Sequence, residues 1–106
     1  MKGSTFRKNT TPTLRFAMPY PLDMVRGGTI TLSQRDEIIV QKDFTDDSVT
    51  ISRGWVKVKL TREETRLFSS QTKGEAQLHV ELPGDNAAES DPVEFMVGKS
   101  LMGGSK

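Results

Sequence analysis

His79 is the first residue to consider for chemistry, because it is the one histidine in this chain of 106 residues. It lies between Gln77 and Glu81 in an alternating segment, on the side opposite the apolar residues. The chain has no cysteine, so it offers neither a thiolate nucleophile nor a sulfur ligand for zinc. A serine triad would need His79 as its base, and the sequence has no Gly-x-Ser-x-Gly turn to carry the nucleophile. We interpret His79 as a surface residue, with a pH-responsive contact as the alternative.

Acidic residues are the next candidates, because clustered carboxylates can bind calcium or act as a catalytic pair. The clusters are Asp43, Asp46 and Asp47 in one segment, and Glu89 and Asp91 in another. Neither has the ligand spacing of an EF-hand loop, and acidic residues are common in turns between strands. Glu63 and Glu64 are adjacent, and adjacent residues of a helix do not face each other. We predict no catalytic residue, no metal site and no cofactor.

A basic strand with an aromatic residue is the remaining candidate site. Its members are Arg53, Trp55, Lys57 and Lys59. Single-stranded nucleic acid binds to such combinations of positive charge and aromatic surface. We expect facing acidic residues to cancel this charge, and one aromatic residue makes a small stacking surface. Nucleic-acid binding by a small β-barrel is therefore the alternative function, and the main prediction is a domain that binds other proteins.

Composition and charge narrow the class of protein. Lys and Arg number 15 and Asp and Glu number 14, interspersed along the chain, so no general attraction to nucleic acid or to anionic membranes is predicted. Hydrophobic residues make up 34%, which predicts a thin core that a partner subunit often helps to cover. No apolar run approaches the roughly 20 residues of a membrane helix, and residues 1–8 lack the apolar stretch of a signal peptide. We expect synthesis in the cytoplasm and no membrane partner.

Alternating apolar and polar residues predict an all-β fold. The segments are 13–18, 29–34, 37–42, 49–51, 55–60, 75–82 and 92–97. Short strands at spacings of roughly 8–12 residues, with polar turns between them, are typical of a two-sheet antiparallel sandwich. The residues expected to form the core are Leu14, Phe16, Ile30, Leu32, Val56, Val58, Leu60, Leu78, Val80 and Phe95.

The segments between the strands carry their own signals. Thr61 and Glu64 form a capping-box pattern that predicts one short helix, with Leu67 and Phe68 anchoring its end. Residues 35–36 predict a hairpin turn, residues 27–28 a glycine turn, and residues 83–91 a polar loop. We predict a flexible N-terminal arm over residues 1–10, a sandwich domain over 11–101 and a flexible tail over 102–106. The first and last strands of the domain are expected at sheet edges.

Four segments resemble small prophage-encoded proteins of Gram-positive bacteria that are related to the N-terminal domain of baseplate upper proteins. The segments are Thr11 to Phe16, Ile30 to Gln34, Val58 to Phe68 and Gly74 to Val80. The likeness is strongest from Leu60 to Phe68, which resembles the family's Leu-Thr-Gln-Glu-Glu-Thr-Leu-x-Phe pattern. The chain departs from the family at Arg62, at Ala76 and in a longer loop over residues 84–91.

The resemblance implies an immunoglobulin-like β-sandwich that is a structural protein of the virion. Its expected place is a phage tail, baseplate or fibre-attachment region, where it would bind other phage structural proteins as a homo- or hetero-oligomer. The resemblance transfers no catalytic residue and no cofactor. Residues before Thr11 and the loop at 83–92 are the expected contacts, because sheet edges and end loops are open to a neighbouring strand.

Overall fold

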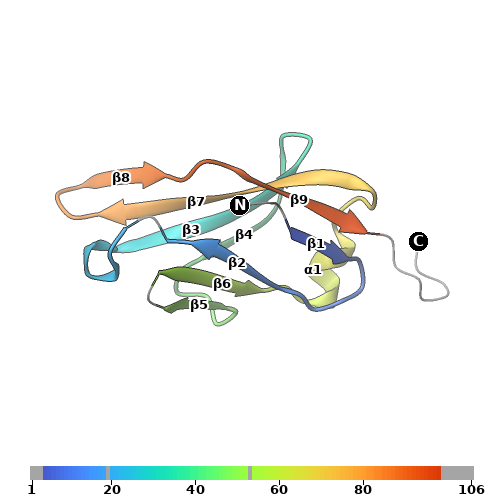
Figure 1. The fold of residues 1–106 in the computed structure, drawn as a ribbon, viewed down its shortest axis with the longest axis horizontal. Helices are drawn as coiled ribbons and strands as arrows, with labels where there is room; N and C mark the ends of the chain where they lie inside the picture. The colour runs from blue at the N-terminus through green and yellow to red at the C-terminus, as the bar shows by residue number, and fades with distance from the viewer. Residues whose placement is uncertain (1–3, 19, 53, 99–106) are drawn as a thin grey trace.

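The computed structural model describes residues 4–18, 20–52 and 54–98. Two β-sheets lie one over the other, with a short α-helix at one end (Figure 1). The strands are β1 Ser4–Arg7, β2 Thr13–Ala17, β3 Gly27–Gln34, β4 Glu37–Asp43, β5 Val49–Ser52, β6 Trp55–Lys59, β7 Thr72–Leu82, β8 Asn86–Glu89 and β9 Val93–Gly98. The helix α1 spans Arg62–Arg66, and a 3-10 turn, η1, spans Leu22–Met24. The predicted fold, all-β with one short helix, is confirmed.

Sheet pairing follows a simple order within the described residues. The larger sheet runs β1-β9-β7-β3-β4, with β8 paired to the far part of β7, and the smaller sheet runs β2-β6-β5. Neighbouring strands are antiparallel except β1, which runs parallel to β9. The β3–β4 turn has positive φ at both Arg35 and Asp36, which is the conformation of a two-residue hairpin turn. This turn is where the sequence predicts it.

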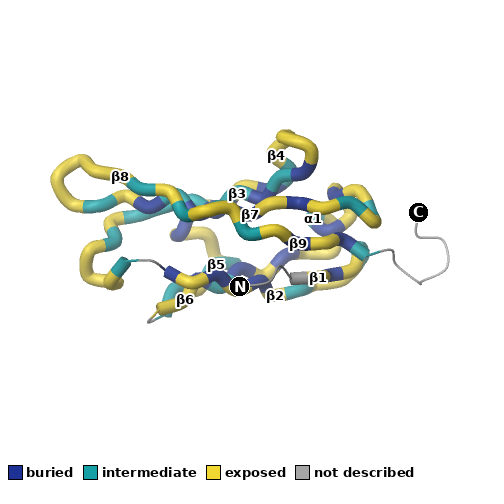
Figure 2. The backbone as a smooth tube through the Cα atoms, turned by 45° about the horizontal axis from the view of Figure 1, so that its top comes forward, coloured by how far each residue is buried: buried dark blue, intermediate teal, exposed yellow. Residues whose placement is uncertain are grey.

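The core lies between the two sheets, along the inward positions of the strands (Figure 2). All ten residues predicted to form it are buried. In β2 the residues alternate between exposed and buried, as expected of a strand with one face on the core and one in solvent. Alternation therefore identified inward residues of β2, β3, β6, β7 and β9.

The N-terminal segment differs from the prediction of a flexible arm over residues 1–10. Residues 4–7 form β1 and pair in parallel with β9, and Phe6 is buried at 5% exposure. The backbone N–H of Asn9 donates to Thr65 Oγ1 at 3.0 Å, which fixes the chain after β1 to the helix. The prediction is wrong for residues 4–10, because the pairing of β1 with β9, the buried Phe6 ring and the Asn9 hydrogen bond together hold this segment in the fold. Residues 1–3 and the expected tail at 102–106 lie outside the described residues.

Three phenylalanine rings close the end of the sandwich beside α1. Phe6 comes from β1, Phe68 follows α1, and Phe95 lies on β9. The ring centroids are 5.5 Å apart for Phe6 and Phe68, 5.6 Å for Phe6 and Phe95, and 5.7 Å for Phe68 and Phe95. Two of these contacts are edge-to-face and one is stacked, the arrangements that aromatic pairs prefer. Below we call these residues the phenylalanine cluster.

Three further expectations are corrected, two about loops and one about an edge strand. Residues 86–89 form β8, which pairs with β7, and Gly84 and Asp85 both adopt positive φ in the turn between the two strands. The polar loop expected at 83–91 is therefore mainly a hairpin. Gly27 and Gly28 lie in the first part of β3, not in a turn, because Gly28 leaves room for the ring of Phe44. The last strand, β9, lies between β1 and β7, so it is not an edge.

The helix α1 begins at the predicted capping box. Glu64 N donates to Thr61 Oγ1 at 3.1 Å, and Thr61 N donates to the Glu64 side chain at 2.8 Å. The helix ends over the phenylalanine cluster, where Phe68 is buried as predicted. Leu67 is 62% exposed, so the expectation that it helps to anchor this segment is wrong. A helix of this length depends on such contacts, because it is too short to be stable alone.

We predict that Phe6→Ala lowers the free energy of unfolding by about 3–5 kcal/mol, because it removes one ring from a buried cluster. Thr5→Ala, on the exposed side of the same strand, should change it by less than about 0.5 kcal/mol. Chemical denaturation of the two variants measures both values. Equal stability of the two variants would mean that β1 does not belong to the fold.

We also predict that Gly28→Ala destabilises the domain while Gly27→Ala does not. A Cβ at Gly28 meets the carbonyl of His79 and the ring of Phe44, and a Cβ at Gly27 meets nothing within 4 Å. The expected loss for Gly28→Ala is about 1–3 kcal/mol, as for overpacking. Thermal unfolding of both variants tests this, and equal melting temperatures would contradict the position of Phe44.

Candidate interaction surfaces

The outward side of the smaller sheet carries positive charge and an aromatic ring. Its outward residues, which we call the basic face, are Thr13, Arg15, Ala17, Thr50, Ser52, Trp55, Lys57 and Lys59. Arg15 lies directly opposite Lys57 on the neighbouring strand. The guanidinium carbon of Arg15 lies 4.5 Å from the centroid of the Trp55 ring, in a cation–π contact. The register of β2 against β6 thus brings Arg15, which is distant in the sequence, beside Trp55, Lys57 and Lys59.

The basic face has no carboxylate to balance its charge. None of its outward positions on β2, β5 and β6 is acidic. Among the described residues, Arg15, Lys57 and Lys59 form no ion pair. The expectation that facing acidic residues cancel the charge is therefore wrong for this sheet. Arg53, the fourth predicted member, lies outside the described residues.

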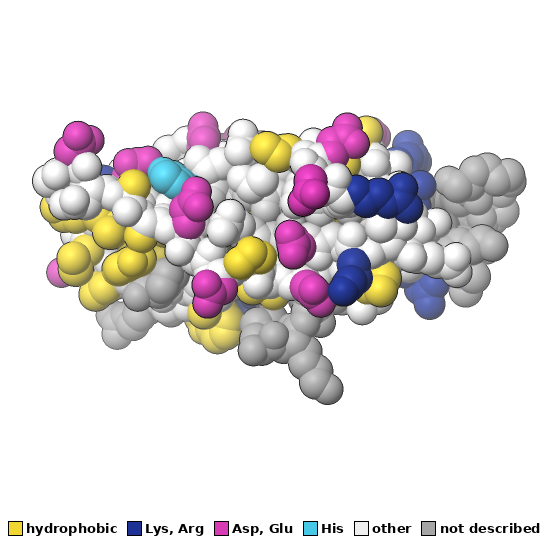
Figure 3. All heavy atoms as spheres, turned by 90° about the horizontal axis from the view of Figure 1, so that it is seen from above, with side chains coloured by type: hydrophobic (Ala, Val, Ile, Leu, Met, Phe, Trp, Pro, Cys, Tyr) yellow, Lys and Arg dark blue, Asp and Glu magenta, His cyan; other side chains and the backbone are white. Residues whose placement is uncertain are grey.

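The outward side of the larger sheet is acidic. We call this surface the acidic face. Its carboxylates are Asp43 on β4, Glu75 and Glu81 on β7, Glu89 on β8 and Glu94 on β9, and it includes the residues between them. Seen from above, acidic side chains are spread over this sheet (Figure 3). Basic side chains are fewer here, with Arg7 and Lys73 among the described residues. Lys73 pairs with Glu94 at 3.4 Å, and both side chains are more than half exposed.

His79 lies on the acidic face between two carboxylates. Its Nε2 is 2.6 Å from Glu81 Oε2, and its Nδ1 is 3.4 Å from Glu89 Oε2. Hydrogen bonds to Glu81 first and Glu89 second raise the pKa of His79 above its usual 6.5. The interpretation of His79 as an outward-facing residue is correct, and both ring nitrogens have carboxylate partners.

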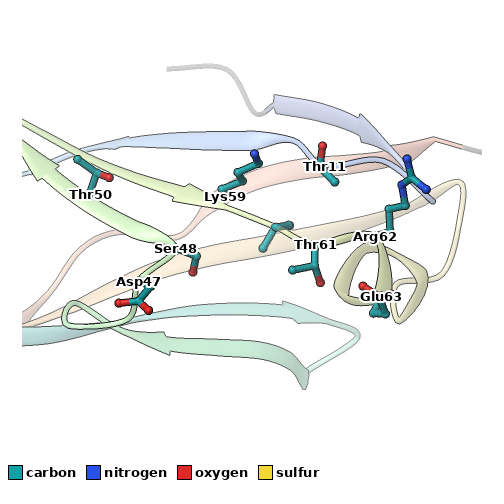
Figure 4. A pocket seen from close by; sticks show the side chains of 9 residues that line it. Thr11, Asp47, Ser48, Thr50, Lys59, Thr61, Arg62 and Glu63 are labelled. Carbon is teal, nitrogen blue, oxygen red and sulfur yellow. The ribbon is translucent and has the colours of Figure 1, made fainter.

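An open hollow of about 450 Å³ borders the basic face near the start of α1 (Figure 4). Its lining side chains come from the segment before β2, the β4–β5 turn, β5, the end of β6 with the residues after it, and α1. They are Thr11, Asp47, Ser48, Thr50, Lys59, Leu60, Thr61, Arg62 and Glu63. Charges of both signs surround it, and Thr61 is already used by the helix cap. The hollow brings together no acid–base pair and no ligand set.

Asp46, one of the acidic residues considered for metal binding, has a structural partner. Ser48 donates to Asp46 Oδ1 from its hydroxyl at 2.6 Å and from its backbone N–H at 2.9 Å. These hydrogen bonds lower the pKa of Asp46. Lys42, which is 8% exposed, donates to Ser48 Oγ at 2.7 Å and pairs with Glu64 Oε2 at 2.9 Å. The described residues contain no group of three or more potential metal ligands, and Glu63 and Glu64 do not form a carboxylate pair.

Comparison with known proteins identifies the fold and no family. No family model matches the chain, and no curated protein matches it. The natural-killer-cell receptor NKp44 is similar in structure, with 16% identity over 94% of this chain and 100% of that chain, at a TM-score of 0.50. A strand-swapped dimer of the mouse leukocyte-associated immunoglobulin-like receptor 1 domain has 10% identity over 92% and 88%, at a TM-score of 0.49. Extracellular domains 3–5 of Drosophila OTK have 12% identity over 96% of this chain and 34% of theirs, at 0.47.

The strand order defines an immunoglobulin-like sandwich. The larger sheet, β9-β7-β3-β4, matches the G-F-C-C′ order of a variable-type domain, and β2-β6-β5 matches B-E-D. Antibody domains join strands B and F with a disulfide, but this chain has no cysteine. Leu14 and Phe16 face inward from the B-like strand and Leu78 from the F-like strand. No helix among the described residues is long and apolar enough to span a membrane.

We predict that His79 titrates above 6.5 in the folded domain, and that Glu81→Gln lowers its pKa more than Glu89→Gln does. A raised folded pKa contributes stability that is fully present below 6.5 and is lost as the pH rises through the raised value. Histidine ring resonances followed by NMR measure the pKa. Glu94→Gln, on the same face, should leave it nearly unchanged, and a wild-type pKa at or below 6.5 would contradict the geometry.

Proposed function

We propose that this domain is a non-enzymatic assembly module, a structural protein of a phage tail, baseplate or fibre-attachment region that acts in the virion by binding other tail proteins. The observation that carries the assembly role is the pair of broad, oppositely charged sheet faces. Such faces offer an extended contact, whereas His79 and Asp46, two of the candidates for chemistry, are hydrogen-bonded within the fold. Extended complementary surfaces of this kind give specificity in protein association.

The phage role is supported by the sequence resemblance from Leu60 to Phe68, and the structure gives that segment a physical purpose. Leu60 and Phe68 are buried, and Thr61 and Glu64 cap the helix. Thr65 accepts a hydrogen bond from Asn9 N at 3.0 Å and is itself buried. Many side chains of this segment stabilise one end of the sandwich. A sequence pattern with that role can be shared by proteins of one fold.

Contacts with other tail proteins are proposed for surfaces that remain free in the fold. The tip of the β7–β8 hairpin at residues 83–85 is one, because it extends beyond the sandwich at the end opposite α1 (Figure 1). Residues 4–10, the other contact expected from the sequence, are part of the domain through β1. We therefore propose the two charged faces, in place of residues 4–10, as the other contact surfaces.

Nucleic-acid binding is a second candidate, because Arg15, Lys57, Lys59 and Trp55 share one face. Stacking with bases would compete with the Arg15 contact on the Trp55 ring, and no second aromatic side chain lies among the described outward positions of this sheet. The acidic face would play no part in it. We therefore favour protein assembly.

The phage role predicts that the chain is found in purified particles. Particles released from the strain that encodes the chain should contain it in a constant ratio to the major tail protein, measured by quantitative mass spectrometry. Deleting its gene should yield particles with defective tails, and a plasmid copy should restore them. An abundant chain in the cell extract with none in the particles would refute the role. Phe6→Ala is the control variant, because its defect lies in folding and not in a contact surface.

A further inference from the structure

The two outer faces of the sandwich carry opposite charge on a chain whose formal net charge is only +1. The basic face has three cationic side chains and, on the described strands, no carboxylate. The acidic face has five carboxylates on four strands. One domain therefore presents two complementary surfaces on its two opposite sides.

Each face also contains a pair of like charges placed directly opposite each other on neighbouring strands. On the basic face the pair is Arg15 and Lys57, which form no ion pair among the described residues, and on the acidic face it is Glu75 and Glu94, of which Glu94 is partly compensated by Lys73 at 3.4 Å. Like charges in this position destabilise a sheet. A surface of opposite sign laid over either pair would remove the repulsion. Both pairs are relieved at once if the two surfaces come from copies of the same chain.

An exposed apolar side chain lies among the charges of each face. Trp55 is 37% exposed on the basic face, and Met96 is 39% exposed on the acidic face, between β1 and β7. Tryptophan is enriched among the residues that contribute most to protein interfaces, and methionine adapts its shape to a partner. Charge provides orientation, and Met96 together with the part of Trp55 that stays exposed beside Arg15 provides apolar area to bury.

We propose that copies of this domain stack face to back, with the basic face of one copy on the acidic face of the next. Such a contact uses two different surfaces, so an open stack keeps one free face at each end and grows into a filament unless it closes into a ring. This inference rests on the proposed assembly function and names its partner as a second copy. A nucleic acid would fit the basic face alone and leave the charge of the acidic face unexplained.

Variants that neutralise one face at a time separate stacking from other kinds of association. Lys57→Gln with Lys59→Gln weakens the basic face, and Glu75→Gln with Glu94→Gln weakens the acidic face. All four side chains lie on outward positions, so both variants should fold. Asp36→Asn with Glu37→Gln, at the β3–β4 turn and off both faces, is the matched control for lost carboxylates.

The wild-type chain should associate with rising concentration in about 0.01 M salt, where the Debye length is about 30 Å, and dissociate in about 1 M salt, where it is about 3 Å. Sedimentation velocity measures the size. Trp55 is the single tryptophan, so its emission should shift to shorter wavelength on association. Each face variant alone should associate about tenfold more weakly, as expected for the loss of two exposed ion pairs. The turn control should behave as the wild type does.

Mixing the two face variants gives the decisive result. Each retains one intact face, so the mixture should form a complex of one copy of each and grow no further. A wild-type chain that stays monomeric in about 0.01 M salt at millimolar concentration would overturn stacking. So would face variants that associate like the wild type, or salt-sensitive binding of single-stranded DNA that shifts Trp55 emission without self-association. None of these results bears on the presence of the chain in particles, so the proposed function is tested separately.

Discussion

The packing of Phe6, Phe68 and Phe95 is the contact on which the rest of the domain depends. These rings come from β1, from the end of α1 and from β9, segments that lie far apart in the sequence. In this chain, which has no disulfide between its sheets, they join the N-terminal strand, the helix and the last strand at one point. Gly74 faces the Phe95 ring across the β7–β9 pair, where any Cβ would collide with that ring. The cluster therefore also explains why a glycine interrupts the longest strand.

Around this cluster a set of buried polar contacts determines where α1 lies. Gln34 donates to Ser69 O at 3.0 Å and accepts from Ser69 N at 2.7 Å, which attaches the end of β3 to the segment after the helix. Lys42 pairs with Glu64, which also caps the helix. Because buried polar groups are costly when unpaired, each of these side chains specifies one arrangement.

The sequence predicted the features that local patterns encode, and it missed the features that depend on pairing between distant segments. Alternation identified the inward residues of β2, β3, β6 and β7, and the Thr61–Glu64 spacing identified the start of α1. Ser4–Arg7 is too short to show alternation, and its partner strand lies at the other end of the chain, so β1 was missed. Asn86–Glu89 contains few residues that favour strands, and β8 forms because the turn before it returns the chain to β7. Lys57 and Lys59 were placed outward correctly, but only the register of β2 showed that Arg15 joins them.

The parallel pairing of β1 with β9 has a mechanical consequence for a protein proposed to act in a tail. A pull applied through Ser4 and Gly98 draws the two strands past each other in opposite directions, because they run side by side in the same direction. The hydrogen bonds between them then lie across the load and must break together, whereas bonds in a hairpin open one at a time. The buried ring of Phe6 lies between this pair and the core, so sliding β1 also requires the ring to leave the phenylalanine cluster. The domain is therefore built to resist tension along its length at the point where its two end strands meet.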